Sequence, residues 1–231
     1  MNRQHLLPML ALVGFFALLL GLFSWSRYVE THNYLDPADA VAEIARQENN
    51  APVPVRLPSL RFTDPSRGST STAALTVVEF GDFNCLSCRL LEPELRRAMQ
   101  AFPTQARLVW RDLPLNADQP DGLLPAIAGR CAQDQGKFWE MHDAMFATAK
   151  LDQKGIRTAA SSINLNMTTF DDCVNNNHHA DEIKADVVQE RESGIRQTPT
   201  LFVGSYAIDG VIKAQELANL IAQVLAAGKT K

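Results

Sequence analysis

The sequence predicts an α/β fold with a helical insertion, preceded by one N-terminal transmembrane helix. An apolar, β-branched strand at residues 75–80 is followed by a polar turn and a helix over 86–102. Helical spacing dominates residues 118–197, and a hairpin pattern at 200–208 then returns the chain to the sheet. An uncharged apolar run occupies residues 6–25.

The apolar run at residues 6–25 is long enough to cross a bilayer. As a helix it extends roughly 30 Å, the thickness of the hydrocarbon core. Arg3 and Arg27 flank it, and Trp25 and Tyr28 lie where interfacial aromatic residues are expected. A cleavable signal peptide is the alternative, but its apolar core is usually shorter, about 7–15 residues. We therefore predict a membrane anchor over residues 1–27.

The rest of the chain divides into a spacer and one folded domain. Residues 28–59 combine a short helix with a Pro- and Ser-rich spacer, and a short edge strand is predicted at 55–62. The folded domain covers residues 60–228, with the helical insertion at about 118–197. A second strand at 106–111 should pair in parallel with the first, because a helix connects them.

Composition excludes some classes of partner. The 231 residues carry a net charge of −4 and a sequence pI near 5.7, so no nucleic-acid partner is expected. The four cysteines are too few for a disulfide scaffold, but they allow two pairs in an oxidising compartment.

The pair Cys85-x-x-Cys88 predicts redox chemistry. Its spacing brings both sulfurs to one face at the start of a helix. Unpaired N–H groups there favour a thiolate at Cys85, which is the attacking species in disulfide exchange. Cys88, one turn further on, would resolve the mixed disulfide. A structural disulfide or half of a metal site are the alternatives.

Several separated motifs together resemble one family. They are the strand before the dithiol, the stretch at residues 136–143, Thr198-Pro199 before the hairpin, and Pro93 after Cys88. Residues 60–228 thus resemble the thioredoxin fold of DsbA-like thiol–disulfide oxidoreductases. The resemblance implies that Cys85 is the nucleophile and Cys88 its buried partner. It also implies that Thr198-Pro199 forms a cis-proline loop that binds substrate and keeps metal from the dithiol.

The resemblance assigns roles to three further residues. Glu79 lies where this family places a buried acid, which would exchange a proton with Cys88; the alternative is a solvated carboxylate at a strand edge. Cys131 and Cys173, in the insertion, match a second, non-catalytic bridge of several relatives. Two free buried thiols are the alternative there. No metal and no cofactor beyond the redox-active Cys85–Cys88 disulfide are expected.

One departure from the family bears on the redox potential. Strongly oxidising members have Pro-His between the cysteines, whereas this chain has Leu86-Ser87. Without an imidazolium the Cys85 thiolate is less stabilised, so we expect a milder potential.

The sequence therefore predicts a thiol–disulfide oxidoreductase acting on cysteines of exported proteins outside the cytoplasm. It would be a single-pass protein of a bacterial inner membrane, held through residues 6–25, with a membrane redox partner. The alternatives are a tethered reductase for a defined client and a copper-handling module that uses Cys85 and Cys88 as soft ligands. A chaperone without redox activity is a further alternative.

Overall fold

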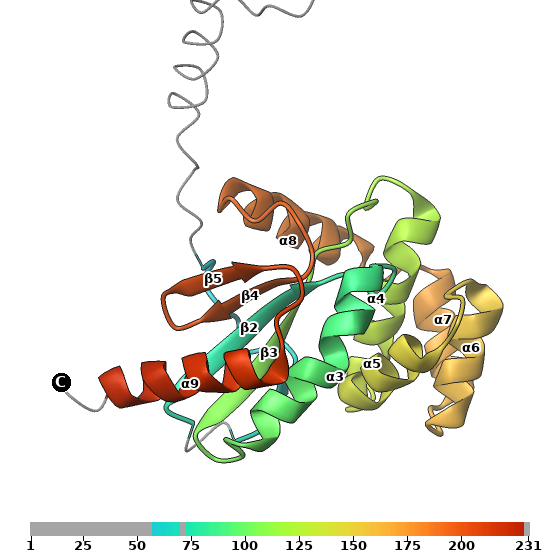
Figure 1. The fold of residues 1–231 in the computed structure, drawn as a ribbon. Helices are drawn as coiled ribbons and strands as arrows, with labels where there is room; N and C mark the ends of the chain where they lie inside the picture. The colour runs from blue at the N-terminus through green and yellow to red at the C-terminus, as the bar shows by residue number, and fades with distance from the viewer. Residues whose placement is uncertain (1–56, 70–72, 229–231) are drawn as a thin grey trace, which may run out of the picture. The chain divides into compact units, whose positions relative to one another are not determined.

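A five-stranded mixed sheet in the order β1-β3-β2-β4-β5 organises the domain (Figure 1). Its centre is the parallel pair of β2 and β3, which the connecting helix predicted. Strands β4 and β5 form a hairpin whose first strand pairs antiparallel with β2, and β1 pairs antiparallel with β3. The strands are β1 (Ser66–Arg67), β2 (Leu75–Gly81), β3 (Ala106–Asp112), β4 (Thr200–Val203) and β5 (Tyr206–Asp209).

The computed structural model describes residues 57–69 and 73–228. The predicted membrane span at residues 6–25 and most of the spacer lie outside this range. Within the described residues, every helix is too short or too polar to cross a bilayer. Membrane anchoring thus stays a prediction.

Helices cover both faces of the sheet. In Figure 1, α3 and α9 lie against one face, α8 lies on the other side, and the remaining helices stack beside the sheet as the insertion. The helices are α3 (Leu86–Gln100), α4 (Pro120–Gln133), α5 (Phe138–Ala147), α6 (Gln153–Ser162), α7 (Met167–Asn175), α8 (Ala180–Glu192) and α9 (Ala214–Gly228). The predicted α/β class with a helical insertion is confirmed.

Alternation along β2 directs its side chains to two cores. Val77 packs with Leu91 and Leu95 of α3, whereas Val78 and Phe80 belong to the core that includes α8 and the insertion. Residues two apart on a strand share a face, so residue 79 points to the same side as Val77. The buried face of α3 therefore lies over the side chain of residue 79.

The predicted edge strand at residues 55–62 is wrong for the part that the structure describes. Residues 57–62 contain no strand, and the edge strand is the two-residue β1 further along the chain. Pro65, which lacks a backbone N–H, directly precedes β1. Gly68 ends it at φ +102°, and a Cβ there would lie 3.2 Å from the carbonyl oxygen of Ala106. The proline and the glycine confine the pairing to two residues.

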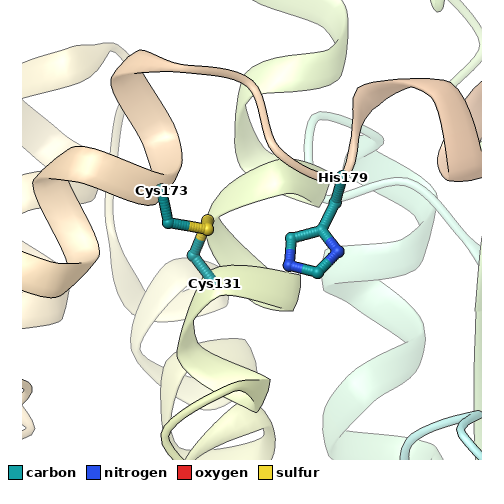
Figure 2. Close-up of side chains that lie close together, drawn as sticks. All are labelled: Cys131, Cys173 and His179. Atoms are coloured by element: carbon teal, nitrogen blue, oxygen red, sulfur yellow. A yellow bond between two sulfur atoms is a disulfide. The ribbon is translucent and has the colours of Figure 1, made fainter.

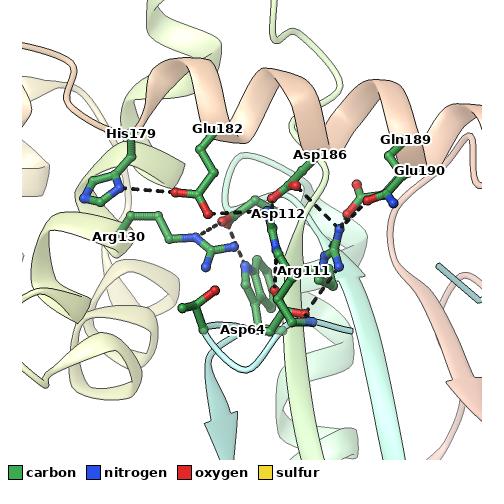
Figure 3. Close-up of polar contacts among 12 residues, drawn as sticks. Asp64, Arg111, Asp112, Arg130, His179, Glu182, Asp186, Gln189 and Glu190 are labelled. Carbon is green, nitrogen blue, oxygen red and sulfur yellow. Dashed lines mark hydrogen bonds and ion pairs between the residues drawn. The ribbon is translucent and has the colours of Figure 1, made fainter. Parts of the chain in front are cut away.

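A buried ion cluster fixes α8 to the sheet (Figure 3). The fully buried Arg111 of β3 lies 3.3 Å from an Asp64 carboxylate oxygen, 3.6 Å from Asp186 and 3.1 Å from Glu190. Arg61 pairs with the same Asp64 and Asp186, so two guanidinium groups meet two aspartates. Burial raises the pKa of Glu190 to about 9 against the opposing effect of Arg111.

We expect Arg111→Met to lower the free energy of unfolding by about 3–5 kcal/mol, because it leaves buried aspartates without one of their cations. Denaturant unfolding at pH 7 measures this. Arg157→Met is the matched control: Arg157 pairs with Asp171 at the surface, where such a pair contributes about 0–1 kcal/mol. Equal losses in the two variants would contradict the assignment.

Candidate active site

The two cysteines of the C-x-x-C pair occupy different environments at the start of α3. Cys85 is the N-cap residue and is half-buried, whereas Cys88 is fully buried in the first turn. Both are free thiols. The Cys85 sulfur therefore adjoins the unpaired N–H groups of the helix start and is the one that a client can reach.

The loop before the dithiol is held by a buried carboxylate. Asp82 accepts hydrogen bonds from the backbone N–H of Asn84 at 2.8 Å and of Leu115 at 3.1 Å. Its backbone carbonyl accepts from the N–H of Cys85 at 2.9 Å. Burial raises the pKa of Asp82, although these two backbone donors oppose the shift. Asp82 thus fixes where the nucleophile lies.

Thr198-Pro199 faces the dithiol from the loop directly before β4. The Thr198–Pro199 peptide bond is cis, and the Cys85 thiol donates to the Thr198 carbonyl oxygen at 3.4 Å. The structure thereby brings together residues 113 positions apart in the sequence. A carbonyl beside the reactive sulfur is a ready acceptor for an extended client backbone.

Glu79 of β2 faces α3, the helix that carries the dithiol, and its side chain is fully buried. Neither of its carboxylate oxygens has a hydrogen-bond partner among the described residues. Burial, and secondly the charge of Glu92, raise the pKa of Glu79 well above its ordinary value. Burial and the charge of Glu79 likewise raise the pKa of the Cys88 thiol. A solvated carboxylate at a strand edge does not fit this burial.

A disulfide joins two helices of the insertion. Cys131 of α4 and Cys173 of α7 are bonded, with their Cα atoms 5.9 Å apart (Figure 2). His179 lies beside them, but its Nε2 contacts Asp134 at 2.9 Å. Because both sulfurs are consumed by the bond, this trio offers no thiolate to a metal. The bond closes a loop of 42 residues, which stabilises by about 4 kcal/mol in the chain-entropy model.

Exposed apolar and polar surface surrounds the reactive sulfur. Leu86, next to Cys85, is 68% exposed, and Leu90 and Leu115 are also exposed. A cleft of about 620 Å³ begins at Asn84 and runs toward the insertion. Its other lining residues include Asn116, Gln119, Lys150, Asp152 and Asn177. This surface can accept a peptide chain beside the dithiol.

Sequence reasoning missed two buried residues behind Glu79. Glu92 lies one helical turn beyond Cys88 on the buried face of α3, and His142 of α5 contacts it. Arg89 helps to hold α5 in place, since it donates to the Phe146 and Thr148 carbonyls at 2.9 and 2.7 Å. The i,i+4 spacing of Cys88 and Glu92 was the available signal for Glu92. His142 lay in the stretch 136–143 without an assigned role.

A family model described as thioredoxin matches residues 62–223. Curated relatives include the Na(+)/H(+) antiporter NhaA 1 of Salinispora arenicola, 37% identical over 149 residues that cover 62% of this chain and 23% of that protein. NhaA 3 of Salinispora tropica is 31% identical over 160 residues, covering 69% and 24%. The chain thus spans about a quarter of the length of these relatives, and their antiporter activity is not carried over to it.

Solved structures share the fold at low identity. Oxidised BdbD from Bacillus subtilis is 19% identical with a TM-score of 0.63, and the match covers 71% of this chain and 94% of that one. A single-residue variant of α-DsbA1 from Wolbachia pipientis is 19% identical with a TM-score of 0.64, covering 77% and 96%. The catalytic domain of Proteus mirabilis ScsC is 21% identical with a TM-score of 0.57, covering 80% and 98%. These likenesses confirm a thioredoxin fold that carries a helical insertion.

We expect Glu79→Gln to stabilise the fold increasingly as the pH rises from 5 to 8. Because its pKa is raised, folded Glu79 keeps a proton that the unfolded chain releases; its contribution to stability is complete below about pH 4.5 and is lost as the pH rises through the folded pKa. Glutamine has no such loss. Denaturant unfolding of both proteins across this range measures the difference.

Glu94→Gln is the control of opposite sign. A hydrogen bond from the Ala214 N–H lowers the pKa of Glu94, so its contribution is present at high pH and is lost as the pH falls. A constant difference between Glu79→Gln and the parent at every pH would show that Glu79 does not titrate as its burial requires.

Proposed function

The chain belongs to the thioredoxin family, and on that premise we propose that it is a thiol–disulfide oxidoreductase acting on cysteines of exported proteins. Cys85 is the nucleophile, Cys88 the resolving thiol and Glu79 the proton-exchanging acid. The observation that carries the proposal is the asymmetry of the pair: an accessible sulfur at a helix N-cap and a buried sulfur above a buried carboxyl.

In the reducing direction the Cys85 thiolate attacks a client disulfide. A bond forms between Cys85 and one client sulfur, and the other client sulfur leaves with the electron pair. Glu79 releases its own proton and takes that of Cys88, and the Cys88 thiolate then attacks Cys85. The second client sulfur leaves, the client is reduced by two electrons, and Cys85–Cys88 is oxidised. The oxidising direction is the reverse of these steps.

The cis-proline loop supports a role in client binding. An extended client strand that pairs with the Thr198 carbonyl would place its cysteine against Cys85, because that carbonyl lies 3.4 Å from the sulfur. Pro199 has no N–H to offer, so the pairing on this side depends on carbonyl groups. The exposed Leu86 and Leu115 would contact apolar client side chains.

Action outside the cytoplasm is part of the proposal. The bonded Cys131–Cys173 pair is typical of oxidising compartments. One structure of the same fold, from Salmonella enterica serovar Typhimurium, is described as a periplasmic thioredoxin-like protein. We place the domain on the extracytoplasmic side of a bacterial inner membrane, held by residues 6–25, where a membrane redox partner would recycle Cys85–Cys88.

We expect Cys85→Ser to abolish both the reduction of insulin and the oxidative refolding of a scrambled client. Cys88→Ser should instead trap a client as a mixed disulfide on Cys85, because the resolving sulfur is gone. The double variant Cys131→Ala/Cys173→Ala, verified as folded by circular dichroism, is the control and should keep activity. Tight copper binding that needs Cys85 and Cys88, without insulin reduction, would favour the copper-handling alternative.

We expect the Cys85–Cys88 couple to have a reduction potential between those of thioredoxin and DsbA, about −270 and −120 mV. The reason is that Leu86-Ser87 supplies no cation to the Cys85 thiolate. Equilibration with glutathione buffers gives the value, and Leu86→Pro/Ser87→His should make it less negative. A parent potential at or above that of DsbA would refute the expectation.

A further inference from the structure

We propose that Glu92 and His142 are positioning residues that carry protons between Glu79 and solvent each time the dithiol is oxidised or reduced. This inference rests on the proposed function and extends it from the reacting sulfurs to the surface of the molecule. It is carried by a row of three buried titratable side chains, Glu79, Glu92 and His142, each of which has a polar atom without a hydrogen-bond partner among the described residues. The row ends at the partly exposed Asp143 of α5.

Glu79, the first member of this row, is enclosed by the protein. It lies on the central strand β2 and is fully buried, and both of its oxygens lack hydrogen-bond partners among the described residues. The proton that Glu79 holds therefore has to leave through a neighbour before Glu79 can take the proton of Cys88. Glu92 is that neighbour, because it lies on the buried face of α3, which covers the side chain of residue 79, and its charge acts on Glu79.

Glu92 connects the dithiol helix with α5. It follows Cys88 by four residues on the buried face of α3 and is 6% exposed. Its Oε1 lies 3.4 Å from Nε2 of His142, and neither atom has a partner with hydrogen-bond geometry in the described structure. Unsatisfied buried polar atoms of this kind are normally bridged by internal water, which also conducts protons between them.

Aromatic rings surround the imidazole of His142. It is fully buried, and its ring centroid lies 4.9 Å from those of Trp110, Trp139 and Phe146. Phe83 and Phe138 complete the enclosure at 5.6 and 6.1 Å. Among the described residues, its two nitrogens contact carboxylates at opposite ends of the ring, Glu92 at Nε2 and Asp143 at Nδ1. An imidazole held in this way accepts a proton at one nitrogen and releases one from the other.

The second ring nitrogen of His142 contacts a partly exposed residue. Nδ1 lies 3.0 Å from Oδ1 of Asp143, whose side chain is 32% exposed. Although burial opposes the shift, hydrogen bonds from His142 and Arg67 lower the pKa of Asp143 to about 2. Asp143 is therefore an anion, and its contact with Nδ1 orients the ring of His142.

Glu92 also borders an opening to solvent. A groove of about 320 Å³ is lined by Glu92, Arg67 and Arg96, with apolar walls from α3 and β3. Arg96 lies 3.7 Å from Glu92 and 3.4 Å from Asp143, and Arg67 lies 2.8 Å from Asp143. The charged groups that face His142 are thus Glu92 and Arg96 on α3, Asp143 on α5 and Arg67 on β1, with Glu79 behind them.

The same residues do not favour a metal ion. Glu92, His142 and Asp143 lie close enough to be considered as ligands. However, Glu92 and Asp143 contact different nitrogens of the ring, and two guanidinium groups already neutralise Asp143. A further cation would be repelled by both arginines.

The proton balance is the same in both directions. When Cys88 attacks Cys85, Glu79 first releases its own proton through Glu92 and His142 to solvent, and it then takes the proton of Cys88. When a client thiolate attacks Cys85 of the oxidised pair, the electron pair goes to Cys88, whose sulfur takes the proton of Glu79. Glu79 is then reprotonated from solvent through His142 and Glu92.

Single-turnover reduction of a disulfide peptide by the full-length chain tests the proposal between pH 5.5 and 8.5. At pH 7 we expect His142→Gln to react about tenfold more slowly than the parent, since its proton transfer is impaired. Added imidazole should restore the rate in proportion to its concentration. His179→Gln is the matched control, because His179 also lies between two carboxylates, Asp134 and Glu182, but far along the chain from the dithiol.

A rate, pH profile and imidazole response in His142→Gln equal to those of His179→Gln would overturn the proposal. Where His142→Gln does not fold, Glu92→Gln takes its place in the same comparison. A purely structural role would lower the rate without any response to imidazole, and that result also counts against proton transfer.

A second measurement does not need activity and therefore separates this proposal from the proposed function. Titration of ¹³C-labelled glutamate carboxyls in the reduced chain should show the midpoint of Glu79 falling in Glu92→Gln, because one negative charge is removed. The ¹⁵N resonances of His142 should follow the Glu79 midpoint in the parent. If neither occurs, the row is not coupled, whatever the enzyme does.

Discussion

A buried sulfur cannot keep a negative charge without help, and this constraint shapes the whole site. Cys88 is fully buried, and burial raises the pKa of its thiol. Disulfide exchange nevertheless requires it to alternate between thiol, thiolate and disulfide. Each alternation releases or takes up a proton inside the protein. The position of Glu79, which is buried, unpaired among the described residues and raised in pKa by the same burial, follows from that requirement.

The two faces of the sheet treat buried charge in opposite ways. On the α8 face, Arg111 and Arg61 neutralise Asp64 and Asp186, and the cluster serves to fix a helix. On the α3 face, the described structure places no cation in contact with Glu79, and a protonated carboxyl is the stable form. Both faces are shielded from water. On the α8 face the chain thus neutralises two aspartates with two arginines, whereas it leaves Glu79, the carboxyl next to the dithiol, without a cation among the described residues.

Local patterns in the sequence were sufficient for the dithiol and for most of the fold. The spacing of Cys85 and Cys88, the strand before them and Thr198-Pro199 are features of neighbouring residues, and the structure places them together. The ion cluster could not be predicted in this way. Arg111 and Glu190 are 79 positions apart, and each looks like an ordinary charged residue in its own strand or helix. Only the packing of α8 across the sheet makes them partners.

His142 shows a further limit of local patterns and gives the insertion a chemical role. Periodicity in α5 predicts which residues are buried, but it treats a buried histidine as one more member of the core. The structure places His142 between Glu92 of the dithiol helix and Asp143 at the surface, with aromatic residues on the remaining sides. The thioredoxin core alone supplies Cys85, Cys88, Glu79 and Glu92, whereas α5 belongs to the insertion. The inserted helices would then do more than shape a client cleft: they supply the group through which the buried carboxyls exchange protons with water.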